Sequence, residues 1–276
     1  MNGVLRGLHS EVRRQVARAS RRWSATRVRR ADLTAALRRL ADPAPPLVLV
    51  HSSLSACGEI DGGAGAVIDM LRAWVGSGTL AMPAHSYSYP SGDRPAPVFD
   101  PLQTPSVVGA ITEAFRRRPA VLRSLHPTHS LAAEGPLAEH LVAGHERCAT
   151  PCGPGTPYER LVQLDAAVLM FGVTLDAYTL FHTAEDAADV PYLYEPSPTD
   201  LRYLGADRRE HALTMRRHDM HVRRTFDRQD KWLESQRLLR RGVLGDGQLL
   251  WIPHAGDAHS IIVRQLQRAP LFLTVL

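Results

Sequence analysis

Residues 47–83 form the stretch that most narrows the folds open to this chain. The stretch begins with the apolar run 47–50, stops at a polar His-Ser-Ser segment, and passes a Gly-Gly pair at 62–63. An amphipathic segment follows over 66–74, and a second apolar run, 79–82, ends at a proline. This order predicts strand, polar loop, helix and strand, the unit of a parallel sheet whose loops at the strand ends bind ligands.

The polar loop of this unit allows two interpretations. Hydroxyls and free backbone N–H groups beside a helix start suit an anionic or carbonyl-rich ligand. Equally, the glycines serve only a tight turn, and the serines only cap the helix. The segment alone does not separate the two.

The rest of the chain continues the alternation of strands and helices. The segment 84–105, rich in Pro, Ser and Tyr, is too long for a connector and indicates a functional surface loop. A hairpin is expected around Gly205. We expect helices over 31–40, 106–117, 132–145, 158–164, 176–188 and 226–240, and strands over 168–173, 249–253 and 271–276. The sequence therefore predicts a single α/β domain with a central, mostly parallel or mixed sheet flanked by helices, with inserted loops. We assign this domain to residues 24–276.

The first 40 residues carry a large excess of positive over negative charge. They hold eleven arginines against two acidic residues, a charge of +9, which leaves −4 for the rest of the +5 total. We predict a basic extension over 1–23, with an amphipathic helix over 4–23. An arginine-rich tail is compatible with nucleic acid, but solvated helix faces explain it better, so no nucleic-acid partner is expected. The mildly acidic remainder suits a cationic substrate.

The remaining bulk features indicate the compartment. No apolar run approaches transmembrane length, and no secretory signal is recognisable, so no membrane partner is expected. Three cysteines, Cys57, Cys148 and Cys152, are too few for a disulfide framework. We therefore expect a cytoplasmic protein.

The strongest candidate for chemistry follows the predicted strand 168–173. In a helix, Thr179, His182 and Glu185 stand at positions i, i+3 and i+6, so His182 and Glu185 are neighbours. A carboxylate beside an imidazole orients the ring and raises its basicity, as a general base near neutral pH requires. The competing interpretation is an ordinary His–Glu pair on a helix surface. The position after a buried strand favours function.

The other groups of candidate catalytic or metal-binding residues give weaker evidence for a site. His126 and His129 lie three residues apart, but Pro127 disfavours a helix that presents both rings together, and no adjacent Cys or carboxylate completes a metal ligand set. No metal is therefore expected. No G-x-S-x-G, Walker A or G-x-G-x-x-G sequence is present. The segment 241–247 approaches the R-x-x-G-x-G loop of the common N-acetyltransferase superfamily, but its arginine lies one residue too far away.

Several segments, in this order, resemble the aminoglycoside 3-N-acetyltransferase family, whose fold differs from that of the common N-acetyltransferases. Two of them, RSLHPTHS within 123–138 and TLFHTAE at 179–185, are quite specific together. The similar segments are 47–55, 62–63, 78–83, 99–119, 123–138, 156–161, 168–173 and 179–185. The resemblance covers about residues 27–276 and weakens after residue 200. Thr156 and Arg160 stand where serine and lysine are frequent in the family.

The resemblance implies the reaction and its residues. It implies acetyl-CoA as cosubstrate, with the acetyl group passing to N3 of a 2-deoxystreptamine ring. His182 corresponds to the catalytic base, Glu185 to its paired carboxylate, and Thr179 to a hydroxyl near the thioester. Residues in segments that line the CoA channel correspond to Ser52, Ser53, Thr79, Ser124 and Ser130. We expect direct transfer in a ternary complex.

An acceptor with several ammonium groups needs carboxylates around it. The candidates lie in the long loop and in the poorly matching region after residue 200: Asp93, Asp100, Asp219, Asp227 and Asp230. Each is equally interpretable as a solvated surface acid. The expected partner is a small cationic amine, an aminoglycoside, and the expected assembly is a monomer or homodimer.

Two alternatives stay open at this stage. A CoA-dependent N-acyltransferase of natural-product biosynthesis would share the chemistry with another amine acceptor. A metal-dependent hydrolase would use His126, His129 and a further histidine.

Overall fold

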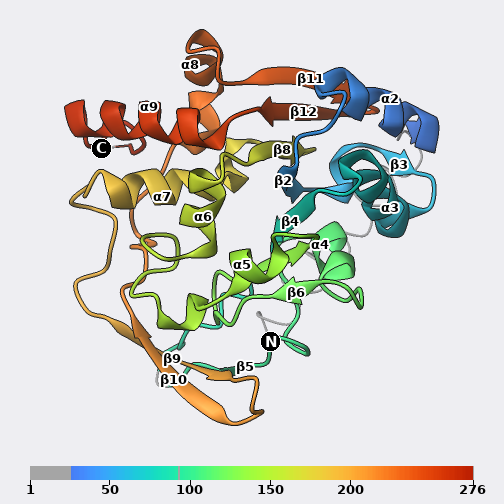
Figure 1. Cartoon of the computed structure of the whole chain (residues 1–276). Helices are drawn as coiled ribbons and strands as arrows, with labels where there is room; N and C mark the ends of the chain where they lie inside the picture. The colour runs from blue at the N-terminus through green and yellow to red at the C-terminus, as the bar shows by residue number, and fades with distance from the viewer. Residues whose placement is uncertain (1–25, 93, 276) are drawn as a thin grey trace, which may run out of the picture.

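A seven-stranded mixed sheet runs through the middle of the computed structural model, which describes residues 26–92 and 94–275 (Figure 1). The strand order is β11-β12-β8-β2-β4-β7-β6. Both β4 and β8 pair with β2 in parallel, whereas the outer pairings are antiparallel. The strands of this sheet are β2 (Leu47–Ser52), β4 (Thr79–Pro83), β6 (Leu122–Arg123), β7 (Leu131–Glu134), β8 (Ala167–Phe171), β11 (Arg240–Leu244) and β12 (Gly247–Ile252).

Helices cover both faces of this sheet (Figure 1). On β2, Leu47 and Leu49 belong to one hydrophobic core and Val48 and Val50 to the other. The run is continuously apolar because side chains of a strand alternate between two buried faces. One face is covered by α5 (Ala138–Val142), α6 (Pro157–Gln163), α7 (Leu180–Ala187), α8 (Asp230–Ser235) and α9 (Ala255–Arg268), and the other by α2 (Arg30–Leu40), α3 (Gly63–Val75) and α4 (Ala110–Phe115). The predicted α/β domain with a mixed sheet is confirmed.

The unit over 47–83 has the predicted form. β2 ends at Ser52, α3 follows, and β4 returns parallel to β2. Gly62 lies in the left-handed region, with φ at 82°, and a Cβ there would lie 2.8 Å from the Cβ of Ala66. A glycine is therefore required at this helix start.

A smaller sheet holds the long loop in place. It comprises β5 (Val98–Phe99) within the loop and the hairpin β9 (Thr199–Leu204) and β10 (Glu210–Met215), which turns at the predicted Gly205. Its own core includes Phe99, Leu201 and Met215. A further two-stranded pair joins β1 (Arg27–Val28) to β3 (Glu59–Ile60), and four short 3-10 turns lie at Leu54–Ala56, His145–Arg147, Leu175–Ala177 and Phe226–Gln229.

Several local predictions differ from the structure, and one helix was not predicted at all. The segment 131–134 pairs with β4 as β7, because tertiary pairing outweighs the helical preference of its alanines. The helix expected over 226–240 ends at Ser235, and Arg240 begins β11. The described part of the strand expected over 271–276, residues 271–275, forms a turn and one isolated bridge instead. The helix α9 was not predicted.

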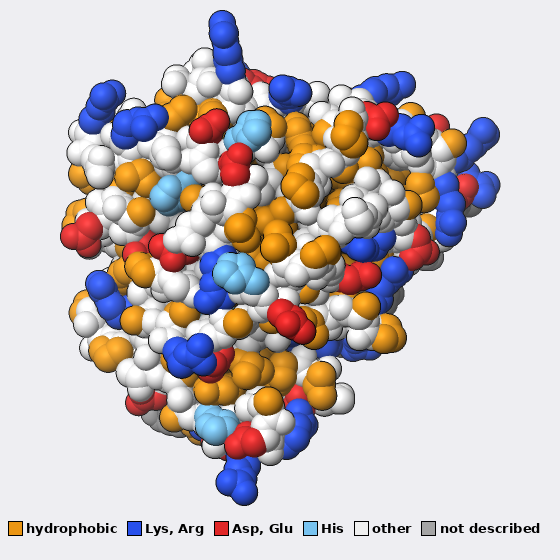
Figure 2. Space-filling model, in the orientation of Figure 1, with side chains coloured by type: hydrophobic (Ala, Val, Ile, Leu, Met, Phe, Trp, Pro, Cys, Tyr) orange, Lys and Arg blue, Asp and Glu red, His pale blue; other side chains and the backbone are white. Residues whose placement is uncertain are grey.

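Three observations concern the ends of the chain and its surface. The basic extension 1–23, its expected helix and the boundary at residue 24 lie outside the described residues. No helix of the described part combines the length and apolar character that crossing a bilayer requires. Acidic and basic side chains are interspersed on the face that Figure 2 displays.

Candidate active site

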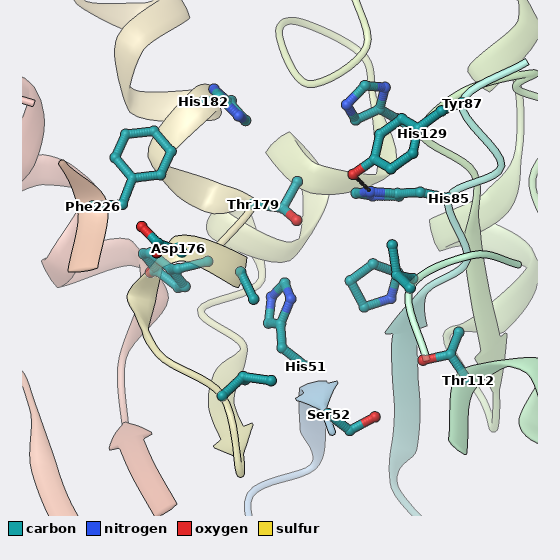
Figure 3. Close-up of a pocket in the computed structure, with 15 residues that line it drawn as sticks. His51, Ser52, His85, Tyr87, Thr112, His129, Asp176, Thr179, His182 and Phe226 are labelled. Atoms are coloured by element: carbon teal, nitrogen blue, oxygen red, sulfur yellow. Dashed lines mark hydrogen bonds between the residues drawn. The ribbon is translucent and has the colours of Figure 1, made fainter. Parts of the chain in front are cut away.

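A cavity of about 330 Å³ opens where the parallel strands end (Figure 3). The end of β2 and the segments that follow β4 and β8 contribute to it, as expected for a sheet whose strand order brings three parallel carboxyl ends together. Its polar and aromatic lining residues are His51, Ser52, His85, Tyr87, Thr112, His129, Asp176, Tyr178, Thr179, His182 and Phe226.

His182 and Glu185 form a direct pair beside this cavity. Both lie on α7, and the Nδ1 atom of His182 is 2.6 Å from Oε2 of Glu185. The Glu185 side chain is fully buried, and Arg224 donates to its Oε1 atom over 3.1 Å. Because a carboxylate accepts, Nδ1 of a neutral His182 carries the hydrogen and Nε2 keeps a lone pair.

The charge of Glu185 is stabilised by its two partners. Burial alone raises the pKa of this carboxyl, but the hydrogen bond and charge of His182, together with Arg224, lower the pKa below its ordinary value. The carboxylate is thus ionised beside the imidazole at neutral pH. This arrangement can orient the ring and stabilise the imidazolium that forms when Nε2 accepts a proton.

Two further sequence candidates lie on the cavity wall. Thr179 precedes α7 and is 6% exposed. Ser52 is the last residue of β2, and its Oγ has no hydrogen-bond partner among the described residues.

The other hydroxyl candidates do not line the cavity. Thr79 accepts from the backbone of Leu137, Ser124 contacts Nδ1 of His145 at 2.9 Å, and Ser130 donates to the carbonyl of Ala84. These contacts occupy the hydroxyls within the protein. Ser53 follows the end of β2 without being part of the cavity lining.

The five acidic candidates do not converge. Asp93 lies outside the described residues. Asp100 accepts two hydrogen bonds from Arg208, at 3.0 and 2.7 Å, and Asp230 pairs with Arg241 at 2.6 Å. Asp227 is exposed, and its backbone N–H donates to Asp176.

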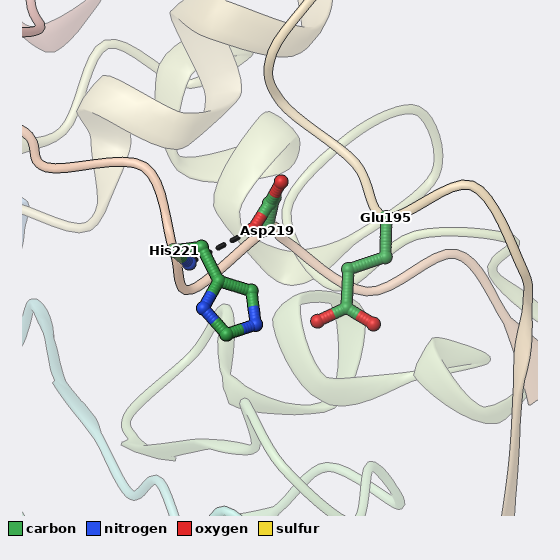
Figure 4. Close-up of side chains that lie close together, drawn as sticks. All are labelled: Glu195, Asp219 and His221. Atoms are coloured by element: carbon green, nitrogen blue, oxygen red, sulfur yellow. Dashed lines mark hydrogen bonds between the residues drawn. The ribbon is translucent and has the colours of Figure 1, made fainter.

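Asp219 belongs to a different cluster. Ligand atoms of Glu195, Asp219 and His221 lie within 4.8 Å of one another (Figure 4). The preceding residue, His218, packs on His182 with ring centroids 4.2 Å apart, and Arg224 bonds the Asp219 carbonyl as well as Glu185. The cluster is therefore linked directly to the His–Glu pair.

Several cavity residues were missed from the sequence. His85 contacts the hydroxyls of Tyr87 and Tyr158 at 3.0 and 2.7 Å, and its ring lies 4.7 Å from that of His129. The signal for His51 was present, because it is the first polar residue at the end of an apolar strand. His85 and Tyr87 had none, since they lie in a long loop without periodicity.

Comparison with known proteins identifies the family. A model of the aminoglycoside 3-N-acetyltransferase family matches residues 49–266. Aminoglycoside N(3)-acetyltransferase IV from a Salmonella species is 33% identical over 254 residues, which cover 88% of this chain and 89% of that protein. Aminoglycoside N(3)-acetyltransferase VII from Streptomyces paromomycinus is 39% identical over 160 residues, 52% of this chain and 55% of that one.

Solved structures agree with this result. The apoenzyme of aminoglycoside acetyltransferase AAC(3)-IVa matches with a TM-score of 0.76 and 31% identity, over 91% of this chain and 92% of the other. AAC-IIIb in binary complex with CoASH matches with a TM-score of 0.76 and 25% identity, over 88% and 97%. A variant of AAC(3)-IVa was solved with a bound gentamicin, with a TM-score of 0.76, 32% identity, and coverage of 90% and 91%.

The fold and the cavity thus belong to an acetyltransferase of the α/β class. The chain is a member of the aminoglycoside 3-N-acetyltransferase family, as the resemblance implied. The family and the CoASH-bound neighbour support acetyl-CoA as its cosubstrate.

Proposed function

We propose that this chain transfers the acetyl group of acetyl-CoA to N3 of the 2-deoxystreptamine ring of an aminoglycoside, with His182 as general base. The observation that carries the proposal is the 2.6 Å contact between His182 and the buried Glu185 beside a cavity at the sheet's carboxyl edge. The family membership and the gentamicin bound to the AAC(3)-IVa variant support an aminoglycoside as the acceptor.

The proposed step is direct transfer between two bound substrates. The acceptor nitrogen attacks the thioester carbon, so an N–C bond forms while the C–S bond breaks. Nε2 of His182 takes the proton that the nitrogen loses, and Glu185 stabilises the resulting imidazolium. The electron pair of the C–S bond leaves on the CoA thiolate, which takes up the proton held by His182 and becomes CoASH, so that the imidazole is neutral again. Thr179 and Ser52 on the cavity wall support binding of the acetyl-CoA arm.

Acceptor recognition is proposed for the cluster Glu195, Asp219 and His221. Two carboxylates near the His–Glu pair suit an acceptor with several ammonium groups. Arg217 already neutralises one oxygen of Glu195, at 2.6 Å, which leaves Asp219 as the main attractive charge. Asp100 and Asp230 already hold arginine partners and fit this role less well.

The test is a thiol-release assay with acetyl-CoA against aminoglycosides and simple monoamines. We expect CoASH release with 2-deoxystreptamine aminoglycosides, and a product acetylated at N3 by NMR. Release with simple amines alone supports the biosynthetic acyltransferase instead, and absence of release with every acceptor contradicts the proposal.

Asp219→Asn should raise the acceptor KM about 3- to 10-fold at low salt, since one such charge contributes about 1 kcal/mol. Asp257→Asn, at an exposed position on α9, is the matched control.

A further inference from the structure

The cavity wall carries buried polar atoms that the protein leaves unpartnered. Nε2 of His51, Oγ of Ser52 and the hydroxyl of Tyr178 have no hydrogen-bond partner among the described residues. All three residues line the cavity, and their exposed fractions are 4%, 8% and 1%. Buried polar groups in folded proteins are nearly always hydrogen-bonded, so unpartnered ones on a cavity wall are candidates for contact with water or with a bound molecule.

Protein contacts set the tautomers of the histidines packed behind the cavity but not that of His51. Nε2 of His126 also has no hydrogen-bond partner among the described residues, but that ring does not line the cavity. His126 accepts a backbone N–H at Nδ1, over 3.0 Å, which requires its hydrogen on Nε2. His145 contacts the Pro151 carbonyl at Nε2, so its hydrogen is also there. The unpartnered Nε2 of His218 is on a ring that packs against His182 and is not part of the cavity lining. No protein group of the described part sets the tautomer of His51, so its Nε2 can carry a hydrogen toward a ligand.

The charge state of His51 follows from its burial. Removal from water lowers the pKa of this imidazole to about 3, so the ring is neutral at working pH. A neutral imidazole offers one N–H donor without adding a buried positive charge. Such a donor is the type of group that stabilises a carbonyl oxygen as negative charge develops on it.

The position of the His51 ring indicates which atom of the ligand it would contact. In Figure 3 the His51 ring points into the cavity and is drawn between Thr179 and Ser52. Under the proposed function, the base acts at the nitrogen that attacks the thioester carbon, and the CoA arm binds on the Ser52 side. A donor between the two is placed for the carbonyl oxygen of the acetyl group.

We propose that His51 is a further catalytic residue, whose Nε2–H donates a hydrogen bond to the thioester carbonyl oxygen of bound acetyl-CoA and strengthens it as that oxygen becomes negative. This inference rests on the proposed acetyl transfer. The His182–Glu185 pair moves the proton, and His51 is a further residue that binds the reacting carbonyl.

The first test measures turnover in two variants at this position. His51→Phe keeps a planar ring but no donor, whereas His51→Gln keeps an N–H donor. We expect His51→Phe to lower kcat about 10²-fold, as loss of a single donor to an oxyanion does elsewhere, with the Kd for CoASH changed less than about 3-fold. His51→Gln should recover at least about 10-fold of the loss. His254→Phe, at an exposed position, is the control, and circular dichroism reports folding.

The second test needs no acceptor. Isotope-edited infrared spectra of acetyl-CoA labelled with ¹³C at the carbonyl should show a lowered C=O frequency in the wild-type complex and in His51→Gln. The shift should be lost in His51→Phe. This result separates the two proposals, because failure of aminoglycoside acetylation leaves the carbonyl contact measurable.

Three outcomes overturn the role of His51. One is a kcat of His51→Phe within about 2-fold of wild type. Another is a CoASH affinity that weakens as much as turnover falls, which assigns His51 to the arm of CoA rather than to the carbonyl. The third is a carbonyl frequency in the wild-type complex that equals the value in water.

Discussion

Three side chains define the chemistry at the residue scale. His182, Glu185 and Arg224 form a chain of contacts in which the carboxylate joins an imidazole at 2.6 Å to a guanidinium at 3.1 Å. The Glu185 side chain is fully buried, so removal of either partner would leave its charge poorly compensated. The same pair on an exposed helix would contribute little, because water screens it.

His182→Ala should lower kcat by about 10²- to 10⁴-fold, the usual contribution of a general base. The affinity for acetyl-CoA should change little, since the imidazole acts on the acceptor proton. Steady-state kinetics with acetyl-CoA and an aminoglycoside, together with calorimetric titration of CoASH, measure both quantities. His254→Ala removes a histidine that also contacts a carboxylate, that of Asp165 at 2.7 Å, and is the matched control. Near-wild-type turnover of His182→Ala would exclude the base assignment.

At the scale of elements, the long loop depends on the β9–β10 hairpin. β5 within the loop pairs with β9, and Asp100 of the loop accepts two hydrogen bonds from Arg208 in the hairpin turn. Arg208 lowers the pKa of Asp100 to about 2. This carboxylate therefore connects the long loop to the β9–β10 hairpin. The same loop contributes Tyr87 to the cavity.

Asp100→Asn should therefore behave like Arg208→Gln. Each removes the same ion pair at the surface, so we expect the same small loss in the free energy of unfolding in both variants and no change in the acceptor KM. Urea unfolding and acceptor titrations of both variants check this. A raised acceptor KM in Asp100→Asn alone would instead support the substrate-binding role expected from the sequence.

At the scale of the whole molecule, the described part of the fold encloses six histidines whose pKa is lowered. Burial is the first cause of the lowered pKa of His51, His85, His126, His129, His145 and His218. The unfolded chain protonates such groups at about pH 6.5. The unfolded state therefore binds more protons below that pH, and stability falls as the solution becomes acidic.

The folded protein should accordingly be acid-labile. Each of these groups contributes up to about 1.4 kcal/mol of destabilisation per pH unit below about pH 6.5, and total stabilities are about 5–15 kcal/mol. We expect the Tm to fall by at least about 10 °C per pH unit between pH 6 and 5. Calorimetry across this range tests it, and His145→Gln should reduce the slope. A Tm constant within a few degrees from pH 7 to 5 would contradict the account.

Local patterns in the chain were sufficient for the framework of the molecule. The order strand, loop, helix and strand over 47–83 follows from apolar runs and glycines that act within a few residues. The adjacency of His182 and Glu185 follows from helical spacing. Strand β7 and helix α9 could not be obtained in this way, because pairing and packing partners far along the chain decide them.

What the sequence by itself determined is thus the family, the mixed α/β sheet and the spacing of the candidate base and its carboxylate. Only the tertiary structure decided which polar side chains face the cavity. Ser124 and Ser130 bond within the protein, whereas His51 and Ser52 remain unpartnered on the wall. The reason is physical, since the cavity joins residues of β2, the long loop and α7 that lie far apart in the chain. Hydrogen-bond satisfaction there depends on neighbours that no local pattern contains.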